Sequence, residues 1–160
     1  RSEFGPRALG ARSIIANPGN KKMKNIINSK IKFRESFRPF APMILAEKAS
    51  DFFDIKKIND DFHPANFMIS VYNSKPNTNM YFSSALNVDN TARIQLIPKG
   101  VSKIRKLLEE FYRKTKLPIL INTSFNRKGE AIVESPYDAL NVFLYTDIDY
   151  LVLENFLIKK

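Results

Sequence analysis

The densest group of side chains suited to chemistry lies in a short basic stretch, Lys30–Pro42. Its cations alternate with aromatic residues. They are Lys30, Lys32, Arg34 and Arg38. Arginine forms paired hydrogen bonds to phosphate, and lysine supplies a compact positive charge. The stretch therefore predicts a site for a phosphate-rich ligand. A solvated basic loop, held in place by core phenylalanines, explains the same pattern.

The spacing in this stretch gives it an expected shape. Lys32 and Arg34 lie two residues apart, so their side chains share one face if the backbone is extended. Pro39 disfavours helical geometry at Arg38, which indicates that any preceding helix ends before it. Three aromatic residues are expected to anchor the stretch in the core. They are Phe33, Phe37 and Phe40.

A second group of polar side chains follows the apolar run 118–121, which has the composition of a buried strand. The group is Asn122, Thr123, Ser124 and Asn126. Ligands of α/β proteins bind where such strands end, and Ser124 and Asn126 alternate onto one face. We expect these two side chains to form the far wall of the cleft that holds Lys32 and Arg34. A turn with local Asn and Ser hydrogen bonds is the alternative. No histidine lies nearby in the sequence, so a serine nucleophile is not expected.

Three further arginines are candidates for binding an anion. Arg7 and Arg12 flank a bend of small residues, where exposed backbone amides favour anions. Arg93 opens a predicted strand beside a turn, from which its side chain can reach into a cleft. The alternatives are surface arginines that pair with Glu3, and a solvated arginine at a strand edge.

Charge is distributed unevenly along the chain. The protein has 160 residues, of which 44% are hydrophobic and 26% charged, and its formal net charge is +10. Residues 1–38 hold ten of its lysines and arginines but only two acidic residues, so they carry +8 of that total. This asymmetry indicates an anionic partner, such as a nucleotide, a nucleic acid or an acidic surface.

Composition also excludes several classes of protein. The chain has no cysteine, which excludes disulfides and thiol chemistry. It has no apolar run long enough to cross a bilayer and no signal peptide, so a cytoplasmic location is the default expectation. His63 is the only histidine, which makes it a poor candidate for a metal site. The first residues read like the middle of a motif, so we expect the chain to be a fragment of a longer polypeptide.

The hydrophobic pattern predicts one mixed α/β domain over residues 1–160. Helices are expected at residues 20–31, 46–53, 101–116 and 135–145, with a single helical turn at 6–9. Strands are expected at residues 12–17, 41–45, 67–72, 93–97, 118–121, 150–153 and 156–158. Polar loops are expected at 55–63 and 73–79. The charge of helix 101–116 is most simply a solvated face.

Four sequence blocks together resemble the C-terminal domain of the O-carbamoyltransferases of nodulation-factor and antibiotic biosynthesis. They are EFGPRALG with the following RSI (3–14), KxRExFRPFAP (32–42), VDxTARxQ (88–95) and NTSFNxxGE (122–130). The blocks occur in the order found in that family and cover most of the chain. Only residues 56–86 match it poorly.

The resemblance implies a YrdC-like α/β fold with a twisted sheet and flanking helices. It also implies binding of ATP, Mg²⁺ with the nucleotide, and carbamoyl phosphate, and formation of a carbamoyl-adenylate. A preceding actin-like, metal-binding domain would then move the carbamoyl group to a hydroxyl. The resemblance assigns the catalytic role to Lys32 and Arg34. The implied nucleotide- or carbamoyl-phosphate-binding residues are Arg7, Arg12, Lys32, Arg34, Arg38, Arg93, Asn122, Ser124 and Asn126.

Two other functions compete with this one. The basic N-terminal third, and the RNA binding proposed for YrdC-like folds, allow a nucleic-acid-binding module. Such modules show an exposed aromatic platform or a recognition helix, which the basic stretch lacks, so nucleic acid is not the expected partner. The third possibility is a catalytically silent domain that only docks to its neighbour.

Overall fold

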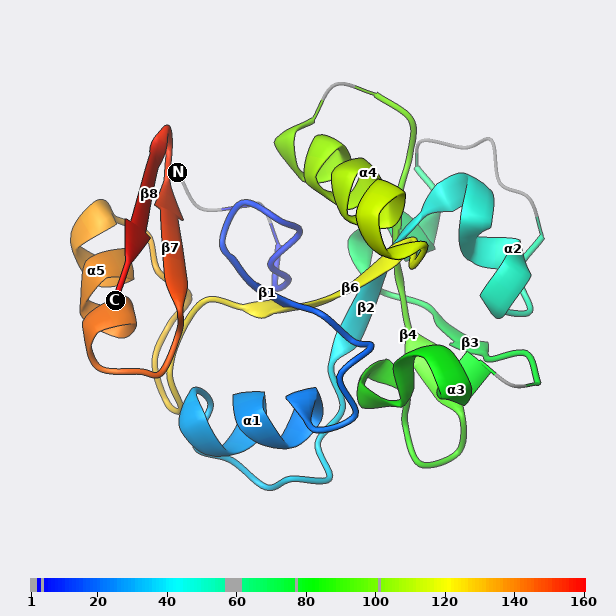
Figure 1. The fold of residues 1–160 in the computed structure, drawn as a ribbon, viewed down its shortest axis with the longest axis horizontal. Helices are drawn as coiled ribbons and strands as arrows, with labels where there is room; N and C mark the ends of the chain where they lie inside the picture. Colours follow the sequence, from blue (N-terminus) through cyan, green and yellow to red (C-terminus); the bar gives the residue numbers. More distant parts are fainter. Residues whose placement is uncertain (1–2, 4, 57–61, 77, 101) are drawn as a thin grey trace.

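The computed structural model describes residues 3, 5–56, 62–76, 78–100 and 102–160. Its centre is a four-stranded sheet with helices on both faces, as Figure 1 shows. The strands of this sheet are β1 (Ser13–Ala16), β2 (Ala41–Leu45), β5 (Gln95–Ile97) and β6 (Ile119–Ser124). The mixed α/β class predicted from the sequence is confirmed.

The sheet has the strand order β1-β6-β2-β5, so β6 is an inner strand, as its apolar sequence predicts. β6 runs antiparallel to β1 and β2, whereas β2 and β5 are parallel. Alternate side chains of β6 enter two separate apolar clusters, because successive strand residues face opposite sides. Ile119 and Ile121 belong to the larger cluster, and Leu120 to the smaller one.

The helices cover these two clusters. α1 (Met23–Lys30) and α5 (Pro136–Leu144) contribute to the larger cluster, while α4 (Lys103–Thr115) covers the smaller one with Leu108. In Figure 1, α1 and α4 lie on opposite sides of β6. The shorter helical elements are η1 (Ala46–Lys48), α2 (Ala49–Phe52), η2 (Pro64–Phe67), α3 (Thr78–Phe82) and η3 (Ser83–Ala85).

Two small antiparallel sheets of two strands each flank the central one. They consist of β3 (Val71–Asn73) with β4 (Thr91–Arg93), and of β7 (Tyr150–Leu153) with β8 (Phe156–Lys159). The β7-β8 hairpin packs beside α5. α5 begins with a capping box in which Ser135 and Asp138 satisfy each other's backbone amides, as the sequence predicts.

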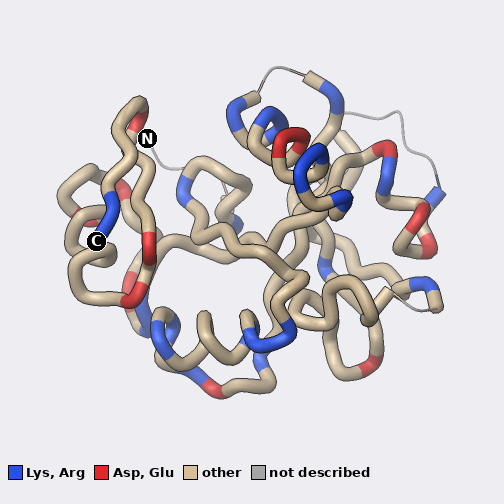
Figure 2. Tube along the Cα trace, viewed as in Figure 1, with Lys and Arg blue, Asp and Glu red and all other residues tan. Residues whose placement is uncertain are grey.

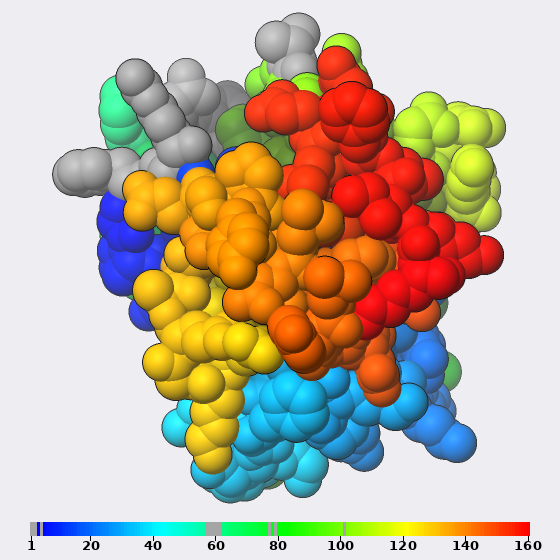
Figure 3. Space-filling view, turned by 90° about the vertical axis from the view of Figure 1, so that its left-hand side faces the viewer, coloured from blue at the N-terminus to red at the C-terminus, as the bar shows by residue number. Residues whose placement is uncertain are grey.

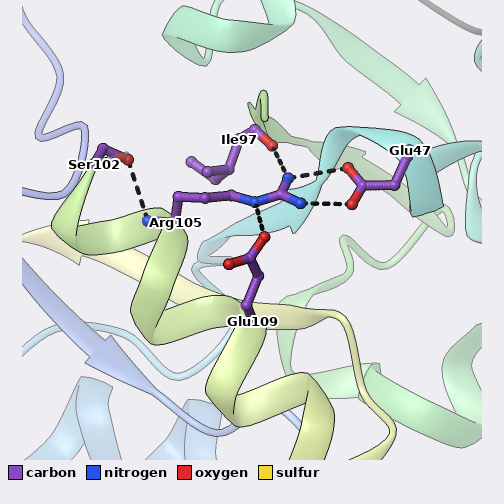
Figure 4. A network of polar contacts seen from close by, with 5 residues as sticks. All are labelled: Glu47, Ile97, Ser102, Arg105 and Glu109. Atoms are coloured by element: carbon purple, nitrogen blue, oxygen red, sulfur yellow. Dashed lines mark hydrogen bonds and ion pairs between the residues drawn. The ribbon is translucent and has the colours of Figure 1, made fainter. Parts of the chain in front are cut away.

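One buried arginine holds α4 against the sheet (Figure 4). Arg105 is 3% exposed and donates to both carboxylate oxygens of Glu47, at 2.6 and 3.0 Å. It also donates to Glu109 at 2.7 Å and to the carbonyl of Ile97 at 3.0 Å. The expectation that the charges of this helix are solvated is therefore wrong for Arg105.

Several local predictions also need correction. Residues 6–9 form a bend followed by irregular chain rather than a helical turn. The strand predicted at 67–72 begins only at Val71, because Met68 adopts a left-handed backbone (φ 56°) after η2. The predicted loop 73–79 contains the start of α3, and the predicted strand 93–97 is divided between β4 and β5 at Ile94. Residue 101, most of the loop 55–63 and part of the N-terminal motif lie outside the described residues.

Within the part of the chain that the structure describes, none of the helices has both the length and the apolar character that crossing a membrane requires.

Candidate anion-binding site

The centre of the site is the buried ammonium of Lys32, which is 5% exposed. Its Nζ donates to the carbonyl and hydroxyl oxygens of Ser124, at 2.5 and 3.2 Å. It also donates to the carbonyl and side-chain oxygens of Asn126, at 2.9 and 2.7 Å. Folding therefore joins the basic stretch to the end of β6, as the sequence predicts, although the two segments touch rather than face each other across a gap. In Figure 3 the basic stretch and the loop after β6 lie on one face of the molecule.

The ammonium of Lys32 has a pKa near neutral pH. Burial, and to a lesser extent the positive charge of Arg34, lower its pKa from 10.5 to about 7, against the opposing effect of Glu130. An anion placed beside Nζ would favour the charged form and raise this pKa again. The group can therefore respond to a bound phosphate or carboxylate by taking up a proton.

Arg34 is held in place by contacts with Asn28 and Phe40 rather than with the end of β6. Its Nε donates to the side-chain oxygen of Asn28 at 2.7 Å, and its guanidinium stacks over the ring of Phe40 at 4.7 Å. Burial, then the charge of Arg38, lower the pKa of Arg34. The guanidinium is thus fixed in place with donors left for a ligand, since arginine carries five N–H groups.

The basic stretch is not the extended segment that the spacing predicts. Phe33 has a φ of 47°, which turns the chain sharply between Lys32 and Arg34, so these two side chains do not share a strand face. Only Phe40 of the three phenylalanines is buried, whereas Phe33 and Phe37 are 50% and 68% exposed. The expectation that the basic stretch lacks exposed aromatic rings is therefore wrong. The turn follows from the end of α1, because the Lys32 amide donates to the Ile27 carbonyl at 2.8 Å.

The loop that carries Asn126 is clamped from both ends. Arg12 is buried and donates from Nη1 to the Val133 carbonyl at 2.9 Å, while its own carbonyl accepts from the Phe125 amide. Phe125 is 7% exposed and anchors the loop in the larger apolar cluster, as predicted. The side chain of Asn126 also donates to the Glu130 carbonyl at 2.7 Å. The clamp fixes the oxygen atoms around Lys32.

Arg7 and Arg93 form a second concentration of positive charge. The Nε atom of each is buried and has no hydrogen-bond partner among the described residues. Burial, then the charge of Arg7, lower the pKa of Arg93, so the two guanidinium groups lie within electrostatic range of each other. Unpaired buried donors are costly, and an anion between them would satisfy both.

A buried polar contact connects the two groups of cations. Asn122 is 1% exposed and donates to the Ala8 carbonyl at 3.0 Å and to the side chain of Gln95 at 2.7 Å. Gln95 in turn donates to the Leu9 carbonyl at 2.8 Å, which ties the loop containing Arg7 to the sheet. Asn122 precedes Ser124 by two residues along β6, a distance of about 7 Å. Both Arg7 and Lys32 therefore lie near the same end of one strand.

The sequence predictions identify most, but not all, of these residues. Lys32, Ser124 and Asn126 come together, and Arg34 lies beside them. Arg38 lies at the rim, with its side chain 54% exposed and paired with Glu35 at 3.3 Å. His63 uses its Nδ1 to cap η2, so it acts as a local structural residue.

Three polar residues that hold the site together were not predicted as part of it. They are Asn28, Gln95 and Glu130. Asn28 is fully buried and donates to the carbonyls of Ser36 and Arg38 while accepting from Arg34. The sequence offered a signal for each of them. Asn28 is a polar residue beside the apolar stripe of α1, and Gln95 and Glu130 end the motifs VDxTARxQ and NTSFNxxGE.

No group of three histidine, aspartate or glutamate side chains converges on a potential metal position within the described ranges. The site is instead rich in cationic and neutral hydrogen-bond donors. These donors fit phosphate oxygens, and a magnesium ion that arrives with a nucleotide can keep phosphate and water ligands.

Comparison with known proteins agrees with the resemblance seen in the sequence. The family model described as "Carbamoyltransferase C-terminus" matches residues 1–160. Nodulation protein NolNO of Sinorhizobium fredii is 44% identical over 161 residues, which cover 100% of this chain and 23% of that protein. Nodulation protein NolO of Bradyrhizobium diazoefficiens is also 44% identical, over 100% of this chain and 29% of its own length.

A more distant relative, nodulation protein U of Sinorhizobium fredii, is 37% identical over 84% of this chain and 23% of its own length. The chain thus spans less than a third of the length of these curated relatives. The full-length match to the family model and the identities above place it plainly: this chain belongs to the family of carbamoyltransferase C-terminal domains.

Proposed function

We propose that this chain is the nucleotide- and carbamoyl-phosphate-binding domain of an O-carbamoyltransferase. Membership of the family supports carbamoyl transfer as the overall chemistry. One observation carries the proposal further: folding buries Lys32 against Ser124 and Asn126, residues 92 and 94 positions away in the chain. A buried ammonium beside hydroxyl and amide groups is suited to phosphate oxygens.

The proposed substrates are two anions, ATP and carbamoyl phosphate. Two groups of cations are available for them, one containing Lys32 and Arg34 and the other containing Arg7 and Arg93. Holding two like-charged reactants together in water is unfavourable, and fixed positive charge offsets their repulsion. Variants of Arg34 and Arg93 distinguish which anion each group of cations binds.

The proposed reaction forms a carbamoyl-adenylate. Carbamoyl phosphate is first hydrolysed to carbamate and inorganic phosphate. A carbamate oxygen then attacks the α-phosphorus of ATP, the bond to the β-phosphate oxygen breaks, and pyrophosphate leaves. Charge stabilisation and positioning account for most catalysis of this kind, so no strong general base is needed. Lys32 and Arg34 would neutralise the charge that develops on the α-phosphate.

The rest of the proposal concerns the parts of the protein beyond this chain. The relatives are much longer than the chain, which leaves room for the actin-like domain that the family resemblance implies. That domain would accept the carbamoyl-adenylate and transfer the carbamoyl group to a hydroxyl. A cytoplasmic location, where ATP is abundant, is part of the same proposal.

The test is release of pyrophosphate from ATP and Mg²⁺, measured with and without carbamoyl phosphate. We expect release to depend on carbamoyl phosphate and to fall at least tenfold in Lys32→Ala. The control is Lys30→Ala, because Lys30 is exposed and forms a solvent-exposed ion pair with Asp147 at 3.7 Å.

Calorimetric titration with each substrate alone separates binding from chemistry. A folded protein that binds neither ATP nor carbamoyl phosphate at millimolar concentration would contradict the proposal. If Arg93→Ala weakens carbamoyl phosphate alone and Arg34→Ala weakens ATP alone, each group of cations is assigned to its substrate.

A further inference from the structure

The packing of the fold does not explain why residue 33 is a phenylalanine. Its φ of 47° lies in the left-handed region, and its side chain is 50% exposed. A bulky side chain is strained in this conformation, whereas glycine would adopt it without strain. The ring fills no part of the core that would offset this cost.

The turn itself is required by the end of α1. The amide of Lys32 donates to the Ile27 carbonyl at 2.8 Å, and the amide of Arg34 donates to the Asn28 carbonyl at 3.0 Å. Phe33 lies between these two bonds, so its backbone must reverse there. The bonds explain the conformation of residue 33, but they do not explain why it carries an aromatic ring.

The position of Phe33 in the chain, between Lys32 and Arg34, indicates a role in ligand binding. Phe33 is flanked by the buried Lys32 and the half-buried Arg34, and consecutive Cα atoms are only 3.8 Å apart. Phe33 thus joins the two cations in the chain, and its ring is exposed where a ligand bound by both could contact it. The other two rings of the basic stretch are placed differently, because Phe40 is buried beneath Arg34 and Phe37 lies five residues beyond Lys32.

We propose that the ring of Phe33 stacks against the base of the nucleotide whose phosphates Lys32 and Arg34 hold. This inference rests on the proposed function and adds a residue that recognises the nucleoside part of the substrate. Aromatic side chains stack on the flat face of any base, so the contact provides affinity for the base with little selectivity among bases. Phe33 then contributes to binding AMP or ATP and contributes nothing to binding pyrophosphate.

The sharpest test uses the absence of tryptophan from the protein. Phe33→Trp introduces a single tryptophan at the proposed stacking position. We expect AMP to quench its fluorescence and pyrophosphate to leave it unchanged at concentrations that saturate binding. The matched control is Phe156→Trp, because Phe156 is 73% exposed on the β7-β8 hairpin. Its fluorescence should respond to neither ligand.

Removal of the ring gives an independent test. Phe33→Gly should weaken AMP binding about tenfold, leave pyrophosphate binding within twofold, and maintain or raise the melting temperature because backbone strain is relieved. Phe33→Tyr should keep the affinity of the parent for AMP.

Three results would overturn the inference. Phe33→Gly could bind AMP as well as the parent does, which would show that the ring contacts something else, such as a protein partner. It could lose affinity for AMP and pyrophosphate equally, which would mean that Phe33 only positions Lys32. The parent could bind pyrophosphate and carbamoyl phosphate but no adenine nucleotide, in which case the proposed function fails first, before any variant is made.

Discussion

Lys32 brings one ammonium group to a place where four oxygen atoms surround it and little water reaches it. An ammonium has three hydrogens, so it cannot serve all four oxygens and a ligand together. Asn126 Oδ1 already accepts from both Lys32 and the Ser124 hydroxyl, the latter at 2.6 Å. Binding an anion must therefore replace at least one of these contacts, and Lys32 exchanges protein oxygens for those of the ligand.

Replacement of this ammonium should weaken binding, and it should also cost stability, because it leaves the buried oxygens of Ser124 and Asn126 without their donor. Lys32→Ala should weaken ATP binding about 10- to 100-fold, since a charge-assisted hydrogen bond contributes about 1.5–3 kcal/mol. Titration calorimetry on Lys32→Ala, Ser124→Ala and the control Lys30→Ala would measure this. Equal affinities in Lys32→Ala and the control would mean that ATP binds elsewhere.

The titration of Lys32 should also appear in the pH dependence of stability. Its pKa is about 7 in the folded protein and 10.5 in the unfolded chain, so between these values the unfolded chain binds more protons. The free energy of unfolding should therefore rise with pH from about 7 towards 10.5, by up to about 1.4 kcal/mol per pH unit from this group.

Urea unfolding of the parent and Lys32→Met, at pH 7, 8 and 9, isolates this effect. The stability of the parent relative to the variant should increase with pH over this range and stay constant below it. A relative stability that falls as pH rises would show that the surrounding oxygens hold Lys32 in its charged form.

At the scale of the elements, Asn28 connects α1 to the basic stretch. Asn28→Ala removes two donated hydrogen bonds and leaves Nε of Arg34 without its 2.7 Å acceptor. We expect a loss of about 2–4 kcal/mol in the free energy of unfolding, because buried groups lose their partners. The control Asn25→Ala, at an exposed position of the same helix, should change stability by less than about 0.5 kcal/mol.

ATP binding distinguishes two roles for Asn28. If Asn28→Ala unfolds at a lower urea concentration and still binds ATP as the parent does, the residue supports the helix end and not the site. We expect both properties to decline, since Arg34 is positioned through Asn28.

Arg105 provides a purely structural comparison on the opposite helix, α4. Arg105→Ala leaves Glu47 and the Ile97 carbonyl without their buried partner, which should cost about 3–5 kcal/mol in unfolding free energy. The control Arg113→Ala removes an exposed ion pair with Glu110 and should cost less than about 1 kcal/mol. Thermal unfolding measures both, and a similar melting temperature for the two variants would contradict the importance of the buried network.

The elements differ in how far the sequence predicts them. α5 and its capping box follow from local signals, because Ser135, Pro136 and Asp138 act on their own helix end. The approach of Lys32 to Ser124 is expected from the end of the buried strand and from the family resemblance. The hydrogen bond itself leaves no local pattern, because the two residues lie 92 positions apart. The left-handed turn at Phe33 could not be predicted, because its residue type disfavours the conformation that the end of α1 imposes.

Over the whole molecule, the excess of positive charge has two parts. Figure 2 shows lysines and arginines along α1 and the chain that follows it. Arg12 and Lys32 belong to this excess but are buried in the fold. Lys21 and Lys22 are exposed before α1. We expect the inner cations to bind a specific ligand and the outer ones to add a general attraction for anions.

This division predicts different salt dependences for ATP and for nucleic acid. Binding of single-stranded RNA to the exposed lysines releases counterions. The affinity for RNA should therefore fall steeply as the salt concentration rises from about 50 to 200 mM. ATP held by Lys32 in a buried site should lose much less affinity, because buried charges are poorly screened. The double variant Lys21→Ala, Lys22→Ala should reduce the slope of log affinity against log salt for RNA by about 1.4, or roughly 0.7 for each lysine.

The same variant should bind ATP as the parent does, whereas Lys32→Ala should lose ATP and keep its weak affinity for RNA. Titrations of both ligands across the salt series, by fluorescence anisotropy for RNA and calorimetry for ATP, provide the comparison. A nanomolar affinity for RNA that persists at 200 mM salt and falls in Lys32→Ala would instead identify the buried site as a nucleic-acid site, because only contacts beyond the phosphate backbone survive such salt.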